Sequence, residues 1–167
     1  LSADLMHDIN DMIVHCLRNS IYHGIEKPDA RRKVNKDVAA QLTVDFTSEG
    51  ELLTVKLKDD GAGINSKKIA KVALNSHRYS KSKLDSMSEN QVINLIFVPP
   101  FDGRKHHRHC WTRIGMDAVK DLAHSMNGDA LVSETSSAGT TIEFTVENSA
   151  SRFMTRHSIF DLGIVIQ

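Results

Sequence analysis

Apolar residues in the first part of the chain repeat with the period of an α-helix. Between residues 5 and 22 they are Leu5, Ile9, Met12, Ile13, Cys16, Leu17 and Ile21. Spacings of three and four place these side chains on one helical face. Ser2 is a candidate N-terminal cap, and Gly24 and Pro28 mark the end of the segment. The pattern predicts a long amphipathic helix from Leu5 to Tyr22.

Two stretches that follow alternate between apolar and polar residues, as half-buried β-strands do. Their apolar positions are Leu42, Val44, Phe46, Leu53, Val55 and Leu57. The intervening Ser48-Glu49-Gly50-Glu51 has the composition of a turn, so the pattern predicts an antiparallel hairpin. Where the second strand ends, residues 58–65 read KDDGAGIN, which places acidic residues and glycines at one edge of the sheet.

Helical signals return after this hairpin. Ser66 is the predicted cap of a short helix that reaches Leu74. Ser88 and Gln91 have the spacing of a capping box and predict a helix that reaches Phe97. Two consecutive prolines follow and end that helix, because proline lacks the backbone N–H that a helix interior needs.

The remainder of the chain predicts a loop, a helix and a second hairpin. Residues 102–112 are polar, basic and without period, which is typical of a mobile loop. The next helix is marked by Met116, Val119, Leu122, Ala123 and Met126. Gly128 closes it, and strands are predicted at 130–134 and 140–146. The order of elements predicts an α+β fold: a two-layer sandwich of a mostly antiparallel mixed sheet with helices on one face.

Composition narrows the class of protein. The 167 residues are about one domain's worth, and Lys plus Arg equals Asp plus Glu at 21 each, so no charge excess attracts nucleic acid or an anionic membrane. No stretch approaches the roughly 20 apolar residues needed for insertion into a bilayer. The only cysteines are Cys16 and Cys110, which favours a reducing cytoplasm over a disulfide scaffold. Because no signal peptide follows Leu1, we expect a domain cut from a longer protein.

The predicted first helix carries polar residues beside its apolar face. His15, Asn19, Tyr22 and His23 are three or four positions apart or adjacent, and they form one polar stripe. Asparagine is a poor helix former, so Asn19 within the helix indicates a task for its carbonyl oxygen, such as ligation of Mg²⁺. An ordinary solvated face is the alternative interpretation of this stripe.

The Asp59-to-Gly63 stretch has two interpretations. Gly61 and Gly63 can supply positive φ in a simple turn. Alternatively, the glycines let the backbone pass close to a flat ligand while a carboxylate at the strand end accepts a hydrogen bond from an exocyclic amine. Adenine offers such a donor.

Several short motifs occur in a fixed order between residues 7 and 146. They read HCLRNSI at 15–21, HGIE at 23–26 with Pro28, DxGxG at 59–63, NLIFVPPF at 94–101, GMDAVK at 115–120 and AGTT at 138–141. In this order they resemble the N box, first glycine box, phenylalanine box, end of the second glycine box and closing Gly-Thr motif of the chemotaxis-type histidine kinases, the CheA class. The HGIE motif is the most specific, because it points to the chemotaxis branch.

The resemblance implies the Bergerat-type ATP-binding fold, shared with DNA gyrase, chaperone ATPases and mismatch-repair ATPases. In that fold Asp59 receives the adenine amine, and Gly61 and Gly63 make room for the ring. The resemblance implies ATP and Mg²⁺ as cofactors, with Asn19 holding the metal. It assigns catalytic roles to His15 and Asn19, and it places His15 and His23 beside the phosphates.

The other cofactor-binding residues that the resemblance implies lie next to these motifs. They are Ile64, Arg113, Gly115, Met116 and Thr140. Gly115 opens a helix and would present backbone N–H groups to phosphates, and residues 102–112 would form the lid.

The implied activity is that of a protein-histidine kinase module. It would bind ATP or ADP and transfer the γ-phosphate to a histidine on a separate domain, with position and charge neutralisation as the protein's main contributions. The phosphoacceptor domain and signalling proteins are the expected partners, and we expect the isolated domain to be a monomer. His7-Asp8 faintly resembles a phosphoacceptor pair, but it lies on the N-box helix, where an exposed polar residue is the simpler interpretation.

Some positions depart from the family pattern. Residues 111–115 read WTRIG and keep only the last of three alternating glycines. Side chains there obstruct close backbone approach to phosphates, whereas Arg113 would contribute charge to them. Tyr22 replaces an acidic residue, and Pro100 replaces a glycine. The alternative function is therefore a nucleotide-sensing or protein-interaction module with little or no kinase activity; gyrase-like or chaperone-like ATPases are a third class, weakened by the HGIE match.

Two further features have competing interpretations. His106, His107, His109 and Cys110 are chemically suited to zinc, but ligands so close in sequence lack the spacing that wraps a tetrahedral ion, so a basic lid is favoured. The family usually has a strand before the N-box helix, and this chain begins almost at the helix. We predict an ATP-binding domain at 1–148 and a tail at 149–167, in which residues 159–166 either cover the open sheet edge as a strand or begin a following domain.

Overall fold

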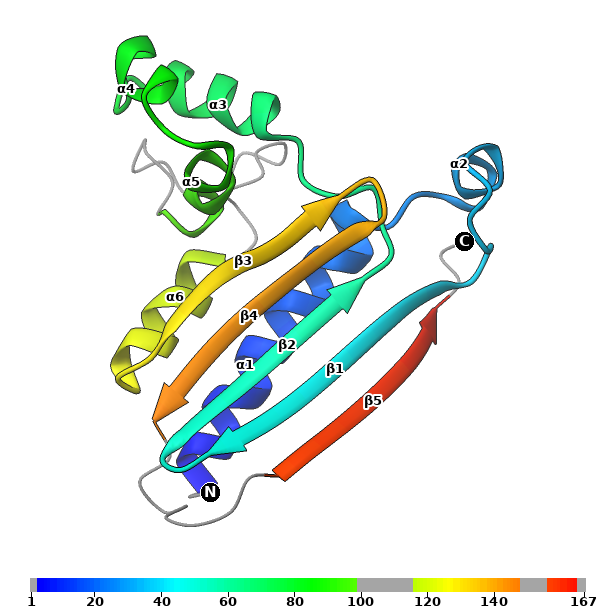
Figure 1. The fold of residues 1–167 in the computed structure, drawn as a ribbon, viewed down its shortest axis with the longest axis vertical. Coiled ribbons are helices and arrows are strands. Elements are labelled where there is room, and N and C mark those ends of the chain that lie inside the picture. The colour runs from blue at the N-terminus through cyan, green and yellow to red at the C-terminus, as the bar shows by residue number, and fades with distance from the viewer. Residues whose placement is uncertain (1–2, 99–115, 148–155, 165–167) are drawn as a thin grey trace.

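A five-stranded antiparallel sheet forms one layer of the molecule, and the computed structural model describes residues 3–98, 116–147 and 156–164 of the chain. The strands are β1 (Ala40–Glu49), β2 (Leu52–Asp59), β3 (Asp129–Ser136), β4 (Gly139–Glu147) and β5 (Arg156–Ile164). Their spatial order is β3-β4-β2-β1-β5, and each neighbouring pair is antiparallel (Figure 1). The α+β fold class predicted from the sequence is confirmed.

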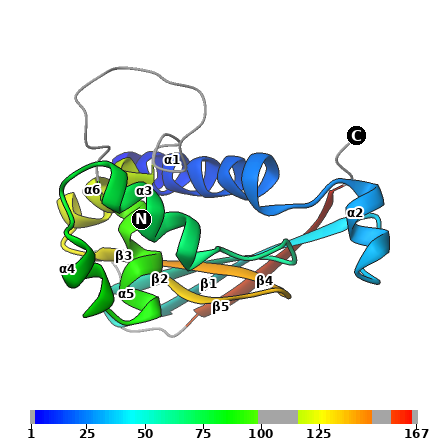
Figure 2. The same cartoon turned by 90° about the horizontal axis from the view of Figure 1, so that it is seen from above.

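Helices pack on one face of this sheet. Helix α1 (Ala3–Asn19) runs along the strands, and α6 (Met116–Ser125) lies beside it on the same face (Figure 2). Their buried residues face the strands because apolar positions repeat at helical spacing. The core between the layers includes Met12, Cys16, Val55, Val119, Phe144 and Val146, each fully or almost fully buried.

The segment after α1 leaves this two-layer core. The α-helix gives way to a π-helical turn, η1 (Ser20–Gly24), in which the Ile25 N–H donates to the Ser20 carbonyl at 2.8 Å. Helix α2 (Pro28–Lys33) follows with proline in its first turn and lies away from the other helices (Figure 1). The predicted first helix is thus confirmed, with a change of helical type in its last turn.

Between β2 and residue 98 the structure describes three short helices and a 3₁₀ turn. They are α3 (Ser66–Asn75), α4 (Lys81–Asp85), α5 (Glu89–Ile93) and η2 (Asn94–Phe97). The predicted capping box of Ser88 and Gln91 is present at α5. The predicted cap at Ser66 is wrong, because the Asn65 side chain accepts the Lys68 N–H and Ser66 begins the helix.

The end of α6 also differs in detail from the prediction. Asn127 adopts the left-handed conformation, with φ of 54°, and the Gly128 N–H closes the helix by donating to the Ala123 carbonyl at 2.8 Å. Asparagine tolerates this conformation better than other non-glycine residues, so it takes the place usually held by glycine.

Strand β5 occupies one edge of the sheet. It pairs with β1 from Ala40 opposite Ile164 to Ser48 opposite Arg156. A strand therefore covers the β1 edge at 156–164, where the sequence predicted one at 159–166. Residues 165 and 166 lie outside the described residues, and the domain boundary at residue 148 stays a prediction. Within the described ranges, no helix is long and apolar enough to cross a membrane.

Candidate functional site

The carboxylate of Asp59 is the centre of the candidate site. Asp59 is the last residue of β2 and is only 4% exposed. Its Oδ1 accepts the Gly61 N–H at 3.0 Å and the Thr140 N–H at 3.2 Å, while its Oδ2 accepts the Ser20 hydroxyl at 2.6 Å. Three donors from three parts of the chain therefore hold the buried carboxylate. These hydrogen bonds are needed because burying a charge without polar partners costs free energy.

The contact with Ser20 brings the end of α1 to the end of β2. Asn19 is the last residue of α1 and directly precedes Ser20, so the predicted metal ligand and the predicted base-recognising carboxylate lie at the same end of the molecule. The π-helical turn begins at Ser20 and carries His23 and Gly24 around this end. Such turns often occur at functional sites.

Asp59 retains capacity to accept another hydrogen bond. A carboxylate offers about four lone-pair positions, and the described residues use two on Oδ1 and one on Oδ2. Gly24 lies next to Oδ2, and a Cβ added to it would be 3.3 Å from this oxygen. The missing side chain at Gly24 therefore lets the backbone of η1 approach this carboxylate closely.

The two glycines after Asp59 lie against protein backbone, and their expected role beside a flat ring stays a prediction. A Cβ on Gly61 would be 2.2 Å from the Gly24 carbonyl oxygen, and a Cβ on Gly63 would be 2.0 Å from the Ser136 carbonyl oxygen. Gly63 also has φ of 76°, so the turn interpretation is correct for it. The glycines let this loop pack against η1 on one side and the β3–β4 turn on the other.

The β3–β4 hairpin completes the site from the opposite direction. Thr140 is buried and its hydroxyl lies 3.1 Å from the Thr135 hydroxyl. The Thr135 oxygen in turn accepts the Ile64 N–H at 2.8 Å. A Cβ on Gly139, which has φ of 133°, would be 1.9 Å from the Asp59 carbonyl oxygen. The Gly-Thr motif and the Asp59 loop are thus interlocked.

The remaining predicted site residues divide into two groups. His15 is half-buried on α1, one turn before Asn19, and His23 lies in η1, where partial burial lowers its pKa below the usual 6.5. The Met116 side chain is buried in the core, so the prediction for this residue concerns its backbone. Arg113, Gly115, the predicted lid and its histidines lie outside the described residues.

Within the described part of the chain, no three His, Cys, Asp or Glu residues gather into a metal site. A Mg²⁺ ion that is bound together with phosphates commonly uses only one or two protein oxygens, with water as the other ligands. Asn19 would be the protein ligand, through an amide oxygen on the last turn of α1.

A cavity of about 770 Å³ lies next to the Asp59 loop. Its walls come from three residues of this loop, from α5 and its cap, and from residues 132–137 at the end of β3. Of the predicted site residues that the structure describes, Ile64 alone lines it. The cavity therefore adjoins the loop after Asp59, and Asp59 itself does not line it.

Three residues that hold the site together were missed by the sequence analysis. Ser20 follows Met12 and Cys16 at spacings of four on the buried face of the helix, and a hydroxyl in an apolar stripe signals a buried partner. Arg31 is fully buried and Lys36 donates to the Gly61 carbonyl, but both belong to a basic stretch that reads as solvent-exposed. No sequence signal distinguishes them from their neighbours.

A helical layer on an antiparallel sheet, with a buried strand-end aspartate facing the end of an Asn-bearing helix, defines a class of ATPase domains. Residues 8–150 match the family described as histidine kinase-, DNA gyrase B-, and HSP90-like ATPase. The chain belongs to this family.

Curated relatives place the chain near the CheA proteins within the family. It is 31% identical over 150 residues to the gliding motility regulatory protein of Myxococcus xanthus, covering 89% of this chain and 19% of that protein. It is 31% identical over 140 residues to chemotaxis protein CheA of Bacillus subtilis, covering 83% and 21%. For sensor histidine kinase CheAY of Helicobacter pylori the identity is 32% over 142 residues, covering 84% and 18%. The chain thus spans about a fifth of the length of these relatives.

Proposed function

We propose that this chain is the Mg-ATP-binding catalytic module of a CheA-like protein-histidine kinase. Family membership supports ATP as the nucleotide, and the named relatives support the kinase class. The γ-phosphate would pass to a histidine on a separate phosphoacceptor domain, and signalling proteins would be the further partners.

The Asp59 carboxylate is the observation that carries this proposal. It is buried, ionically unpaired within the described residues and held by three neutral donors, with a spare acceptor position beside Gly24. An exocyclic amine such as that of adenine supplies the missing donor. A keto group at the same place would set two acceptors against each other, so the site favours adenine over guanine.

The phosphates would extend from the base toward the end of α1. Asn19 would hold Mg²⁺ through its amide oxygen, and His15 and His23 would lie beside the phosphate groups. Charge neutralisation of the phosphates would fall to Mg²⁺ and, by the sequence motif, to Arg113.

Calorimetry with the 167-residue chain tests base recognition through Asp59→Asn. This substitution places an amide nitrogen near the adenine amine, so a donor faces a donor. We expect ATP affinity to fall by roughly a hundredfold, the loss typical of breaking a buried charged hydrogen bond. Asp29→Asn is the matched control, because Asp29 is exposed and pairs with Arg32 on the surface. Equal ATP affinity in the two variants contradicts the proposed base contact.

The same titrations distinguish a kinase module from a nucleotide sensor. The sensor is the second candidate function, because the WTRIG sequence at 111–115 keeps only one glycine of the second glycine box. A kinase module binds ATP with Mg²⁺ at least as tightly as ADP and responds to the γ-phosphate. Tight ADP binding with no gain from Mg²⁺ or the γ-phosphate identifies a nucleotide sensor. Absence of nucleotide binding leaves a protein-interaction module.

A further inference from the structure

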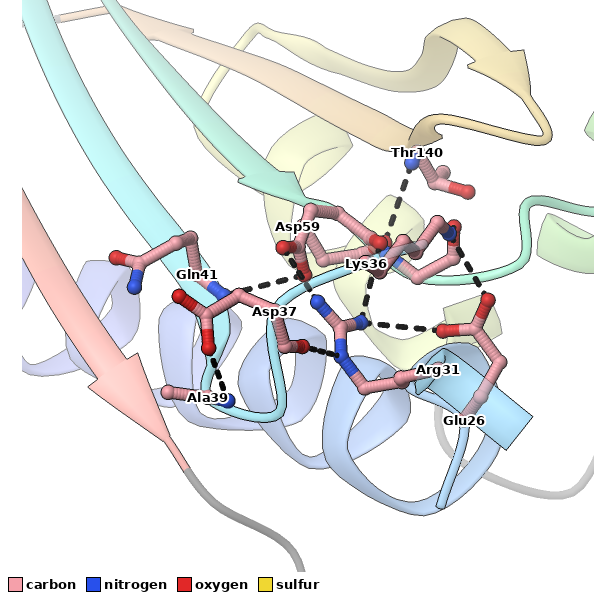
Figure 3. Close-up of polar contacts among 10 residues, drawn as sticks. Glu26, Arg31, Lys36, Asp37, Ala39, Gln41, Asp59 and Thr140 are labelled. Carbon is pink, nitrogen blue, oxygen red and sulfur yellow. Dashed lines mark hydrogen bonds and ion pairs between the residues drawn. The ribbon is translucent and has the colours of Figure 1, made fainter. Parts of the chain in front are cut away.

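Two cations lie beneath the loop that follows Asp59. Arg31, from α2, is fully buried, and Lys36, from the segment after α2, is 17% exposed at its side chain (Figure 3). Glu26 joins them, because its Oε2 accepts from Arg31 at 3.2 Å and its Oε1 accepts from Lys36 at 2.9 Å. Asp60 supplies the second carboxylate, 2.7 Å from the Arg31 guanidinium. The charges of the four groups cancel, as burial requires.

Arg31 holds Asp60 at two atoms. Its Nη2 donates to Asp60 Oδ2 at 2.7 Å, and its Nη1 donates to the Asp60 carbonyl at 3.3 Å. Its Nε donates to the Asp37 carbonyl at 2.5 Å, and this third contact fixes the orientation of the guanidinium plane. Lysine cannot reproduce this forked set of contacts, because its ammonium is a single point charge.

Lys36 binds the backbone carbonyl of the next residue, Gly61. Its ammonium donates to the Gly61 carbonyl at 2.6 Å. The carbonyl oxygens of two consecutive residues, Asp60 and Gly61, are therefore held by two different cations.

Each of these carbonyls shares a rigid peptide plane with an amide that points into the site. The N–H of the Asp60–Gly61 peptide donates to Asp59 Oδ1 at 3.0 Å. The N–H of the Gly61–Ala62 peptide donates to the Gly24 carbonyl at 2.9 Å, and Gly24 lies against Asp59 Oδ2. Because a trans peptide unit is planar, fixing its carbonyl on one side also aims its N–H on the other.

We propose that Arg31 and Lys36 are positioning residues for nucleotide binding, which by holding the Asp60 and Gly61 carbonyls orient the carboxylate that recognises the base. The inference rests on the proposed function. It gives a reason for a buried charge cluster, which by itself is weak support for stability, since well-packed apolar residues often stabilise as well or better. The contacts of Arg31 and Lys36 are made to the backbone segment whose N–H groups hold Asp59 and Gly24.

The test compares Arg31→Met and Lys36→Met with neighbours that lack these contacts. Arg32→Met and Lys33→Met are the matched controls, because Arg32 is 61% exposed with a surface partner at Asp29 and Lys33 is exposed. Calorimetry of the 167-residue chain measures affinity for Mg-ATP and for the inosine nucleotide Mg-ITP, which carries a keto oxygen in place of the amine. Urea unfolding in the same buffer establishes that each variant is folded during the titration.

We expect Arg31→Met and Lys36→Met each to lose roughly tenfold or more in ATP affinity, the loss that follows from misplacing one charge-assisted hydrogen bond. Affinity for ITP should change less, so the preference for ATP over ITP falls. A merely structural role would lower both affinities by the same factor. The controls should retain the preference of the unsubstituted chain.

One outcome overturns the inference: an unchanged preference for ATP over ITP in Arg31→Met and Lys36→Met, whether the two affinities stay the same or fall by equal factors. If Arg31→Met does not fold, Lys36→Met and Asp60→Asn decide, since Asp60→Asn keeps the backbone carbonyl that Arg31 binds but removes the carboxylate charge. Failure of the unsubstituted chain to bind ATP is a different result, because it overturns the proposed function itself.

Discussion

Gly139 and Gly50 both have positive φ beside hairpin turns, but only Gly139 is closely packed against other backbone. Gly50 has φ of 61° in the β1–β2 turn, and a Cβ there would meet nothing within 4 Å. Gly139 has φ of 133°, and a Cβ there would be 1.9 Å from the Asp59 carbonyl oxygen. The two turns lie at opposite ends of the sheet, so only the second glycine touches the candidate site (Figure 1).

Gly139→Ala should therefore damage both stability and nucleotide binding. We expect a loss of roughly 3 kcal/mol in the free energy of unfolding, from overpacking and backbone strain together, because the alanine methyl displaces the end of β2. ATP affinity should fall as well, since that displacement moves the Asp59 carboxylate. Urea unfolding and calorimetry measure the two effects.

Gly50→Ala is the control for backbone strain alone. It should cost about 1–2 kcal/mol, the penalty of a left-handed alanine, with unchanged ATP affinity. If both variants bind ATP equally well, the packing of Gly139 against Asp59 does not matter for the site.

At the scale of elements, local signals predicted the helices and strands, but their ends depended on choices between similar residues. The capping box at Ser88 was predicted because two side chains report it together. At α3 either Asn65 or Ser66 is a good cap, and the sequence does not decide between them. The short helices α2 and α4 were missed, because six and five residues with several basic side chains have no apolar period. The role of α2 depends on Arg31, whose partner Asp60 is 29 positions away in the sequence.

The candidate site was predictable in its types of residue and less so in its contacts. Asp59 and Thr140 were identified from motifs, and the structure joins them through a backbone amide. The roles of Ser20 and Arg31 depend on tertiary contacts to residues 39 and 29 positions away. Periodicity and propensity describe relations between residues that are close in sequence. The distant hydrogen-bond partners of Ser20 and Arg31 can therefore be identified only from the folded structure.

Strand β5 makes a prediction that belongs to the sheet. A chain ending at Thr155 lacks β5 and leaves the β1 edge unpaired, and such edges promote association between molecules. We expect this truncated chain to unfold at lower urea concentration and to self-associate as concentration rises. Denaturation curves and static light scattering measure these changes.

A chain ending at Ile164 is the matched control, because it keeps the whole strand and removes only the last residues. It should behave as the full 167-residue chain does. A chain ending at Thr155 that remains monomeric and equally stable contradicts a role for β5 in covering the edge. Early proteolytic loss of the tail without destabilisation has the same meaning.

At the scale of the whole molecule, Glu26 makes stability depend on pH. Burial acts to raise the pKa of its carboxyl, but the hydrogen bond from Lys36 and the charges of Lys36 and Arg31 outweigh burial and hold it below the usual 4.5. A folded-state pKa below the unfolded value stabilises the fold above about pH 4.5. That contribution is lost as the pH falls through the folded-state pKa.

Urea unfolding at a series of pH values from neutral to acidic measures this dependence. Glu26→Gln removes the titrating group, so its stability should decline less steeply below about pH 4.5 than that of the unsubstituted chain. Glu89→Gln is the control, since Glu89 is exposed and accepts from Ser66 on the surface. Parallel curves for Glu26→Gln and the unsubstituted chain would show that Glu26 is not a source of the pH dependence.

The donors to Asp59 come from widely separated parts of the chain: Ser20 precedes it by 39 residues and Thr140 follows it by 81. Closing such long loops is slow compared with forming local helices, so these contacts assemble late in folding. A nascent or proteolysed fragment that lacks either α1 or the β3–β4 hairpin retains Asp59 but has no completed cradle around it. Ligand occupancy would therefore indicate that α1 and the β3–β4 hairpin are both present and packed around Asp59.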